Sequence, residues 1–173
     1  MRLFLGCPIP PEPASVLAEW AAVALPEESV RVVPATNLHV TLAFYGEVEA
    51  EPAEAMKAKV EAIPWTPKPV RTGCWRYFGR NAIGLDVEGL LDDPWSPELI
   101  ELWRLQPEKE RHRDPRPHVT VARMRPKTTR ATLPTCPTLP FTLSELVLFE
   151  SRLSTEGSTY YPLARASGAT RTE

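Results

Sequence analysis

Two copies of one short pattern carry the chemistry that is visible in this sequence. The stretches His39–Ala43 (HVTLA) and His118–Ala122 (HVTVA) are nearly identical, and together they use two of the three histidines of the chain. Residues two apart in a strand lie on one face, so each copy is expected to present an imidazole beside a hydroxyl. A fold built from two similar halves would bring the two pairs together across a cleft.

Such a set of groups suits reaction at a phosphodiester. Two imidazoles with pKa values near 6.5 can divide the work at neutral pH, one accepting a proton and the other donating one. Two hydroxyls can each donate a hydrogen bond to an oxygen that gains charge. We therefore predict His39 and His118 as the catalytic pair, with Thr41 and Thr120 binding the phosphate and no metal required. Each proton transfer should contribute roughly 10² to 10⁴ in rate.

Other kinds of site find little support in the residues. A single H-x-T on a strand is usually only a polar edge, but a repeat that takes two of three histidines is not expected by coincidence. Zinc prefers three or four ligands, and no Cys, Asp or Glu lies at ligand spacing beside either motif. A nucleophile elbow and a P-loop are both missing from the sequence. Cys7, Cys74 and Cys136 are far apart and odd in number, which predicts neither a disulfide framework nor a zinc site and favours a reducing cytoplasm.

Charge is concentrated around the second motif. The net charge is -2, too small for a protein that holds long nucleic acid by bulk attraction of its phosphates. Between Gln106 and Arg130, however, eight basic residues stand against three acidic ones, a local charge of +5 that leaves -7 for the rest. A charge run of this kind is often only a solvated loop, but this one brackets His118 and favours a local phosphate contact.

The elements around the motifs alternate between strands and helices. Strands are predicted at Leu3–Gly6, 31–33, Leu38–Tyr45, Val70–Tyr77, Ala82–Val87, His118–Arg123, Thr142–Glu150 and Tyr160–Arg165, and helices at about 11–24, 52–63 and 97–105. The order predicts an α+β fold with a mainly antiparallel sheet in each half. At 173 residues the chain fits a single domain. Since no stretch approaches the roughly twenty apolar residues of a membrane span, we expect a soluble, cytoplasmic protein.

At these residues the sequence resembles the two-histidine (2H) phosphoesterases, and within them the bacterial RNA 2',3'-cyclic phosphodiesterases, also called 2'-5' RNA ligases. The similarity runs almost end to end. It is carried by the opening Arg2-Leu3-Phe4, by the stretches Pro34–Phe44 and Arg116–Arg123 around the motifs, and by Leu148–Leu153 with Gly157 and Pro162-Leu163.

The resemblance implies one two-lobed phosphoesterase domain over residues 1–173, with two pseudo-symmetric halves, each a sheet backed by helices, and the active groove between them. It implies cofactor-free hydrolysis of a 2',3'-cyclic phosphate, on RNA or a small cyclic nucleotide, to a 2'-phosphate. His39 matches the histidine that protonates the leaving 3'-oxygen, and His118 matches the one that activates water. Arg123 matches a basic residue that binds substrate. Strict alternation places Arg123 on the face opposite His118, so the strand must end or bend there, or the side chain must reach around.

Two other functions stay open. One is the reverse reaction, which joins RNA ends through a 2'-5' linkage. The other is a non-catalytic module that binds an RNA end or a nucleotide without turnover. No obligate protein partner is implied, and a monomer is the default.

Overall fold

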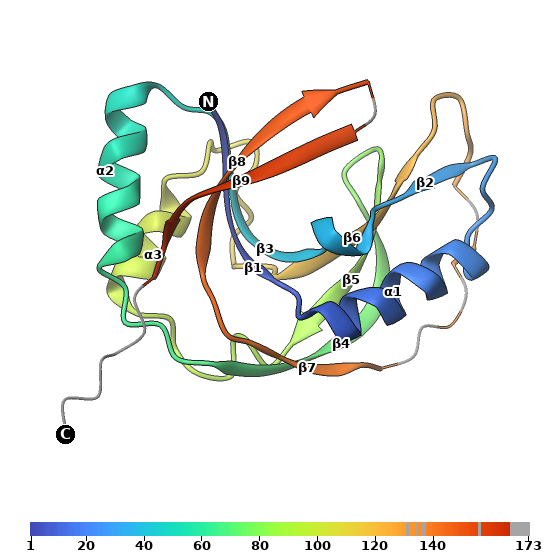
Figure 1. The fold of residues 1–173 in the computed structure, drawn as a ribbon, viewed down its shortest axis with the longest axis horizontal. Coiled ribbons are helices and arrows are strands. Elements are labelled where there is room, and N and C mark those ends of the chain that lie inside the picture. Colours follow the sequence, from blue (N-terminus) through green and yellow to red (C-terminus); the bar gives the residue numbers. More distant parts are fainter. Residues whose placement is uncertain (131, 134, 136–137, 156, 167–173) are drawn as a thin grey trace.

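The computed structural model describes residues 1–130, 132–133, 135, 138–155 and 157–166. The elements follow in the order β1 (Arg2–Pro8), α1 (Pro11–Ala24), β2 (Val30–Val32), the 3-10 turn η1 (Ala35–Asn37), β3 (His39–Glu47), α2 (Ala50–Glu61), β4 (Lys68–Phe78), β5 (Ala82–Glu88), α3 (Pro97–Arg104), β6 (His118–Met124), β7 (Pro140–Leu143), β8 (Val147–Ser154) and β9 (Gly157–Arg165) (Figure 1). The predicted α+β class is confirmed.

All of these strands belong to one antiparallel sheet with two similar halves. The order is β7-β4-β5-β6-β3-β1-β8-β9, and the short β2 pairs with β6 beyond the end of the β3 pairing. From the centre outward, one half reads β3-β1-β8-β9 and the other β6-β5-β4-β7. The two halves thus meet where the two motif strands, β3 and β6, lie side by side. The sequence predicts one sheet in each half, and in the structure these two sheets join at this seam into one.

The sheet is strongly curved, as the connection between β7 and β8 requires. These strands are six places apart in the sheet order, which on a flat sheet would separate them by about 29 Å at the usual spacing of about 4.8 Å. Only residues 144–146 join them, and such a connection reaches about 14 Å. The two ends of the sheet therefore approach each other at the bottom of the molecule, giving the half-barrel seen in Figure 1.

This connection also corrects one prediction. The stretch Thr142–Glu150 was expected to form a single strand, and the structure instead has β7 and β8. β7 pairs with β4 and β8 pairs with β1, so the two belong to different halves of the sheet. The chain has to change direction between them, and one continuous strand could not serve both partners.

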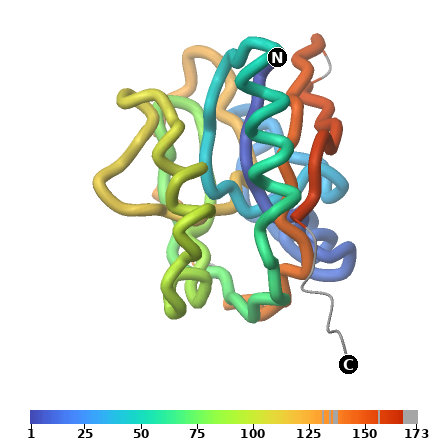
Figure 2. Tube along the Cα trace, turned by 90° about the vertical axis from the view of Figure 1, so that its left-hand side faces the viewer, coloured from blue at the N-terminus to red at the C-terminus, as the bar shows by residue number. Residues whose placement is uncertain are grey.

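The helices pack on different parts of the sheet. α1 contacts η1, β2 and β6, whereas α2 packs on β8, β9 and α3 (Figures 1 and 2). Proline opens α1 at its first turn, and the Ser96 hydroxyl accepts a hydrogen bond from the amide of Leu99 at the start of α3. Among the helices that the structure describes, none is long and apolar enough to span a bilayer.

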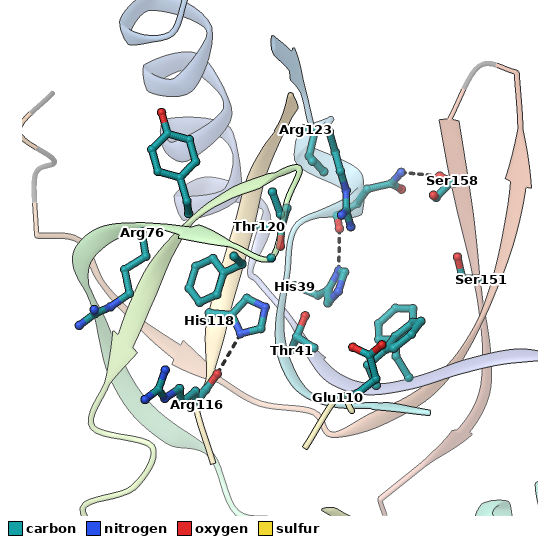
Figure 3. A pocket seen from close by; sticks show the side chains of 18 of the residues that line it. His39, Thr41, Arg76, Glu110, Arg116, His118, Thr120, Arg123, Ser151 and Ser158 are labelled. Carbon is teal, nitrogen blue, oxygen red and sulfur yellow. Dashed lines mark hydrogen bonds between the residues drawn. The ribbon is translucent and has the colours of Figure 1, made fainter. Parts of the chain in front are cut away.

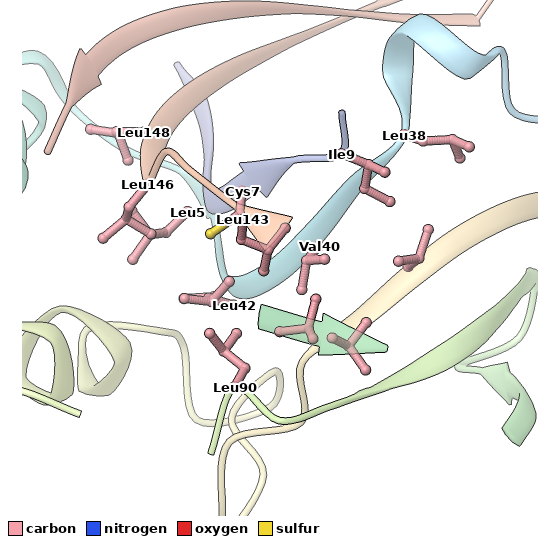
Figure 4. Close-up of a cluster of buried hydrophobic side chains, with 14 of the residues drawn as sticks. Leu5, Cys7, Ile9, Leu38, Val40, Leu42, Leu90, Leu143, Leu146 and Leu148 are labelled. Atoms are coloured by element: carbon pink, nitrogen blue, oxygen red, sulfur yellow. The ribbon is translucent and has the colours of Figure 1, made fainter. Parts of the chain in front are cut away.

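The residues that alternate with the motif side chains build the core. Val40, Val119 and Val121 are fully buried and Leu42 nearly so, and Figure 4 shows Val40 and Leu42 among the leucines of β1, β7 and β8. Burying a side chain of this size contributes about 1.5 to 3 kcal/mol. The same pleat that fixes these residues in the core therefore turns the histidines and threonines to the other face.

Candidate active site

The two H-x-T motifs face each other across the seam of the sheet. Thr41 on β3 is paired with His118 on β6, and Val40 is paired with Val119. Continuing this antiparallel register by one residue sets His39 opposite Thr120. Directly opposed residues of antiparallel strands have Cα atoms about 4.5 to 5.5 Å apart, so two imidazoles and two hydroxyls gather on a small patch (Figure 3).

This patch forms the floor of a large groove. The groove has a volume of about 1200 Å³, above the about 300 to 1,000 Å³ of an ordinary small-molecule site. His39, Thr41, His118, Thr120 and Arg123 all line it. The structure thus brings together every site residue that the sequence predicts.

Each histidine is held in the same way by its own strand entry. Nδ1 of His39 lies 2.9 Å from the carbonyl oxygen of Asn37, and Nδ1 of His118 lies 2.9 Å from that of Arg116. A carbonyl oxygen only accepts, so Nδ1 carries the hydrogen in both rings and donates it. In a neutral ring this leaves Nε2 unprotonated. Both histidines therefore offer the same atom, Nε2, for proton transfer.

The pKa values of both histidines are lowered. Burial lowers the pKa of His39 from 6.5 to about 4, and the positive charges of His118 and Arg123 add to this, while the bond to Asn37 opposes it. Burial also lowers the pKa of His118, with smaller contributions from His112 and Arg123 in the same direction. Both imidazoles are therefore neutral in the empty groove at pH 7.

A carboxylate distinguishes the two histidines. Asp86 on β5 lies opposite His118 and raises its pKa, partly offsetting the effect of burial. The residue at the matching place beside His39 is Pro8, which has no charge. Asp86 is itself bound by Arg76, whose Nε lies 2.6 Å from a carboxylate oxygen. His118 is thus the only one of the pair with an acidic neighbour on the adjacent strand.

Aromatic rings fix the positions of the imidazoles. Phe78 is stacked on His118 with the ring centroids 4.2 Å apart. His39 contacts Phe4 at 4.6 Å and the edge of Tyr160 at 5.1 Å. These ring contacts, together with the Nδ1 hydrogen bonds, restrict the rotation of both imidazoles, so the two Nε2 atoms are held in place before a substrate arrives.

A bulge decides the position of Arg123. On β6, Thr120 pairs with Gly84 and Ala122 pairs with Ile83, so Val121 is an extra residue in its strand. An extra residue reverses the alternation beyond it. Arg123 consequently faces the groove together with His118 (Figure 3). Of the alternatives that the sequence left open, the bend in the strand is the one observed.

The first motif contains the same bulge at the same place. Thr41 pairs with Gly6 and Ala43 with Leu5, which makes Leu42 the extra residue. Phe44 is therefore the counterpart of Arg123, and it too lines the groove. The two motifs share their backbone irregularity as well as their sequence.

The glycines opposite the threonines have no room for a side chain. A Cβ on Gly6 would lie 2.8 Å from the carbonyl oxygen of Val40, and a Cβ on Gly84 would press on the carbonyl of Val119 and lie 2.8 Å from the Phe78 ring. Both clashes involve backbone, which cannot easily move. These glycines let the neighbouring strands approach closely at the bulges.

Only part of the basic segment turns toward the groove. Arg116, Arg130 and His112 line it, whereas Arg125 donates to the carbonyl of Glu27 and Arg111 to that of Arg104. Some of the basic residues behind the local charge of +5 therefore hold the fold together and do not face the groove.

The aromatic residues of the β4–β5 hairpin also line the groove, but each already has a partner. Trp75 stacks on Trp20 with centroids 4.3 Å apart, Tyr77 lies under the guanidinium of Arg130, and Phe78 covers His118. Packing therefore accounts for all three, although Tyr77 and Phe78 still border the space where a base would lie.

Several site residues were not found from the sequence. Asp86 and Tyr160 lie far from the motifs in the chain, and neither they nor Arg31 carry a pattern of their own. The carbonyls of Asn37 and Arg116 had a usable signal, since each stands two residues before its histidine. Among the residues described, no group of three or more His, Cys, Asp or Glu side chains could hold a metal ion. Cys7 and Cys74 are free thiols, and Cys136 lies outside the described residues.

Comparison with known proteins agrees with this geometry. The model of the family described as LigT like Phosphoesterase matches residues 8–82. The RNA 2',3'-cyclic phosphodiesterase of Escherichia coli K12 is 46% identical over 55 residues, which are 32% of this chain and 31% of that protein. The chain thus matches this curated relative over about a third of its length.

Solved structures extend the similarity to nearly the whole chain. The crystal structure of E. coli LigT complexed with phosphate is 28% identical, with a TM-score of 0.70 and 96% of both chains covered. That of E. coli LigT complexed with 3'-AMP is 27% identical, with a TM-score of 0.69 and 98% of both chains covered. In its paired motif strands and over nearly its whole length, the chain is similar to these LigT structures, and residues 8–82 match the LigT like Phosphoesterase family.

Proposed function

We propose that this protein hydrolyses the 2',3'-cyclic phosphate ends of RNA or of small nucleotides to 2'-phosphates, without a metal. The main support is the opposed pair of H-x-T motifs, whose four polar side chains lie on one groove floor with both histidines offering Nε2. The activity named for the E. coli relative and the 3'-AMP complex of E. coli LigT point to the same class of substrate.

In this mechanism the phosphate lies between the two histidines. Nε2 of one imidazole takes a proton from the attacking water, and Nε2 of the other gives a proton to the leaving 3'-oxygen, so the P–O3' bond breaks as the new P–O bond forms. Thr41 and Thr120 donate hydrogen bonds to the non-bridging oxygens, and Arg123 stabilises the added negative charge. By family resemblance His39 is the acid and His118 the base.

The low pKa values add a requirement to this mechanism. Because both histidines are neutral in the empty groove, the acid must gain its proton as the substrate binds. The phosphodiester is an anion, and a negative charge a few ångströms away favours the imidazolium. Substrate binding and protonation of the acid are thus coupled.

We also propose that residues 1–173 act as one two-lobed domain in the cytoplasm. The test of the function is cleavage of a short RNA that ends in a 2',3'-cyclic phosphate, in the presence of EDTA, with separation of 2'- and 3'-phosphate products. Activity lost in both His39→Ala and His118→Ala is expected. Tight binding of a 2'-phosphate end without any product would instead favour a binding module, and joining to a 5'-hydroxyl acceptor would favour ligation.

A further inference from the structure

Two arginines stand side by side at one end of the groove. Arg31 on β2 is paired directly with Arg123 on β6, and both line the groove. Like charges directly opposite each other on neighbouring strands repel and destabilise the pair. A negative charge bound between the strands and the groove would therefore stabilise this arrangement.

The described part of the chain does not supply that charge. Within it, neither Arg31 nor Arg123 forms a salt bridge or a side-chain hydrogen bond, whereas Arg71, Arg76, Arg152 and Arg165 each have a carboxylate partner. As far as the described residues show, Arg31 and Arg123 can therefore bind an anion that comes from outside.

The two arginines serve different parts of the groove. Arg123 is close enough to both motif histidines to lower the pKa of each, while Arg31 contributes to neither. The Arg31 guanidinium lies instead by Gly157 at the β8–β9 turn, where a Cβ would be 3.3 Å from its Nη2. That turn is held to η1 by a hydrogen bond of 2.8 Å from the Asn37 amide to the carbonyl of Ser158.

The position of Arg31 suits a second phosphate on the same ligand. The groove is larger than one small ligand needs. A cyclic phosphate on the histidines would leave the rest of an RNA strand to continue along it, and the next negative group is the phosphodiester on the 5' side of the terminal nucleotide. Arginine binds such a group through charge-assisted hydrogen bonds.

We propose that Arg31 forms a second anion site, which binds the phosphodiester on the 5' side of the terminal nucleotide and makes the protein prefer RNA ends over cyclic mononucleotides. This proposal rests on the function proposed above. It assigns recognition of the strand to Arg31, separate from the reacting phosphate on the histidines and Arg123.

The test compares one substrate that lacks this phosphodiester with one that carries it. One is a cyclic mononucleotide with a free 5'-hydroxyl, and the other is a dinucleotide with the same cyclic end. Arg31→Met should reduce kcat/KM for the dinucleotide about tenfold or more, since a hydrogen bond to a charged group contributes about 1.5 to 3 kcal/mol, and change it less than twofold for the mononucleotide. Arg71→Met, an exposed arginine of β4 outside the groove, is the control and should change neither.

A substrate variant checks the same point without mutation. When the dinucleotide linkage is replaced by an uncharged methylphosphonate, kcat/KM of the wild type should fall by the same factor as it does on the substitution Arg31→Met. In the Arg31→Met variant the methylphosphonate should lower kcat/KM no further. Equal losses on both substrates, or no loss on the dinucleotide, would overturn the second site.

Binding separates this proposal from the function itself. If the wild type cleaves neither substrate, the proposed function fails, and the site is then tested by calorimetry with a mononucleotide and a dinucleotide that both end in a 2'-phosphate. Tighter binding of the dinucleotide that disappears in Arg31→Met supports the site, and equal affinity refutes it.

Discussion

Acid should destabilise this protein through His39, by an amount that follows from the structure. The imidazole has a folded-state pKa of about 4 against 6.5 when unfolded. Between these values the unfolded chain binds a proton that the folded chain does not, so the free energy of unfolding falls as the pH falls from 6.5 toward 4. The gap of about 2.5 pH units corresponds to about 3 kcal/mol. This is an upper figure, because the ring is only part-buried and the groove is open to water.

The matching substitution is His39→Asn. Asparagine keeps a donor near the Nδ1 position, so the hydrogen bond to the carbonyl of Asn37 can persist while the titrating group is removed. Urea unfolding followed by tryptophan fluorescence at pH 7.5, 6.5, 5.5 and 4.5 gives the free energy of unfolding of each protein. The variant should lose less stability than the wild type across this range, by up to about 3 kcal/mol.

The sign of this difference is the critical result. Above pH 6.5 the His39 contribution is constant, and the two curves should run parallel. If His39→Asn instead loses as much stability as the wild type between pH 6.5 and 4.5, the imidazole is not held neutral by burial. The idea that the catalytic acid gains its proton only when the substrate binds would then fail as well.

Three further results are expected. NMR titration should show that Asp86→Asn lowers the pKa of His118, whereas Arg76→Met raises it by freeing the carboxylate; shifts of the same sign in both variants would contradict this arrangement. Gly84→Ala should cost about 1 to 3 kcal/mol in urea unfolding and lower kcat by displacing Phe78 from His118, and an unchanged variant would show that the strands are not tightly apposed. Calorimetry of a 2'-phosphate nucleotide in buffers of different ionisation enthalpy should show proton uptake on binding at pH 7, and no buffer dependence would argue against coupled protonation.

The sequence was sufficient for the parts of the site that depend on strand periodicity. Alternation alone predicts that His39 shares a face with Thr41, and His118 with Thr120. The repeat suggests that the two pairs meet. The first conclusion follows from the geometry of a single strand. The second depends on the pairing of β3 with β6, which is visible only in the fold.

The remaining features depend on cross-strand register, which no local pattern records. The bulge that turns Arg123 into the groove exists because Gly84 allows β5 to approach β6 closely, and Gly84 lies far from Arg123 in the chain. The pairing of Arg31 with Arg123 likewise depends on the register between two strands that are far apart in the chain. The stretch Thr142–Glu150 is predicted as one strand because it is rich in residues that favour strands, while the position of its two partners in different halves of the sheet cannot be seen locally.

The central claim is tested most directly by the reaction itself. A short RNA with a 2',3'-cyclic phosphate end should be incubated with the wild type, His39→Ala and His118→Ala in EDTA, and the products resolved as 2'- or 3'-phosphates. A 2'-phosphate formed by the wild type and reduced at least about a hundredfold in each variant is the expected result. A wild type that forms no product, or a His118→Ala variant as active as the wild type, would contradict the two-histidine mechanism.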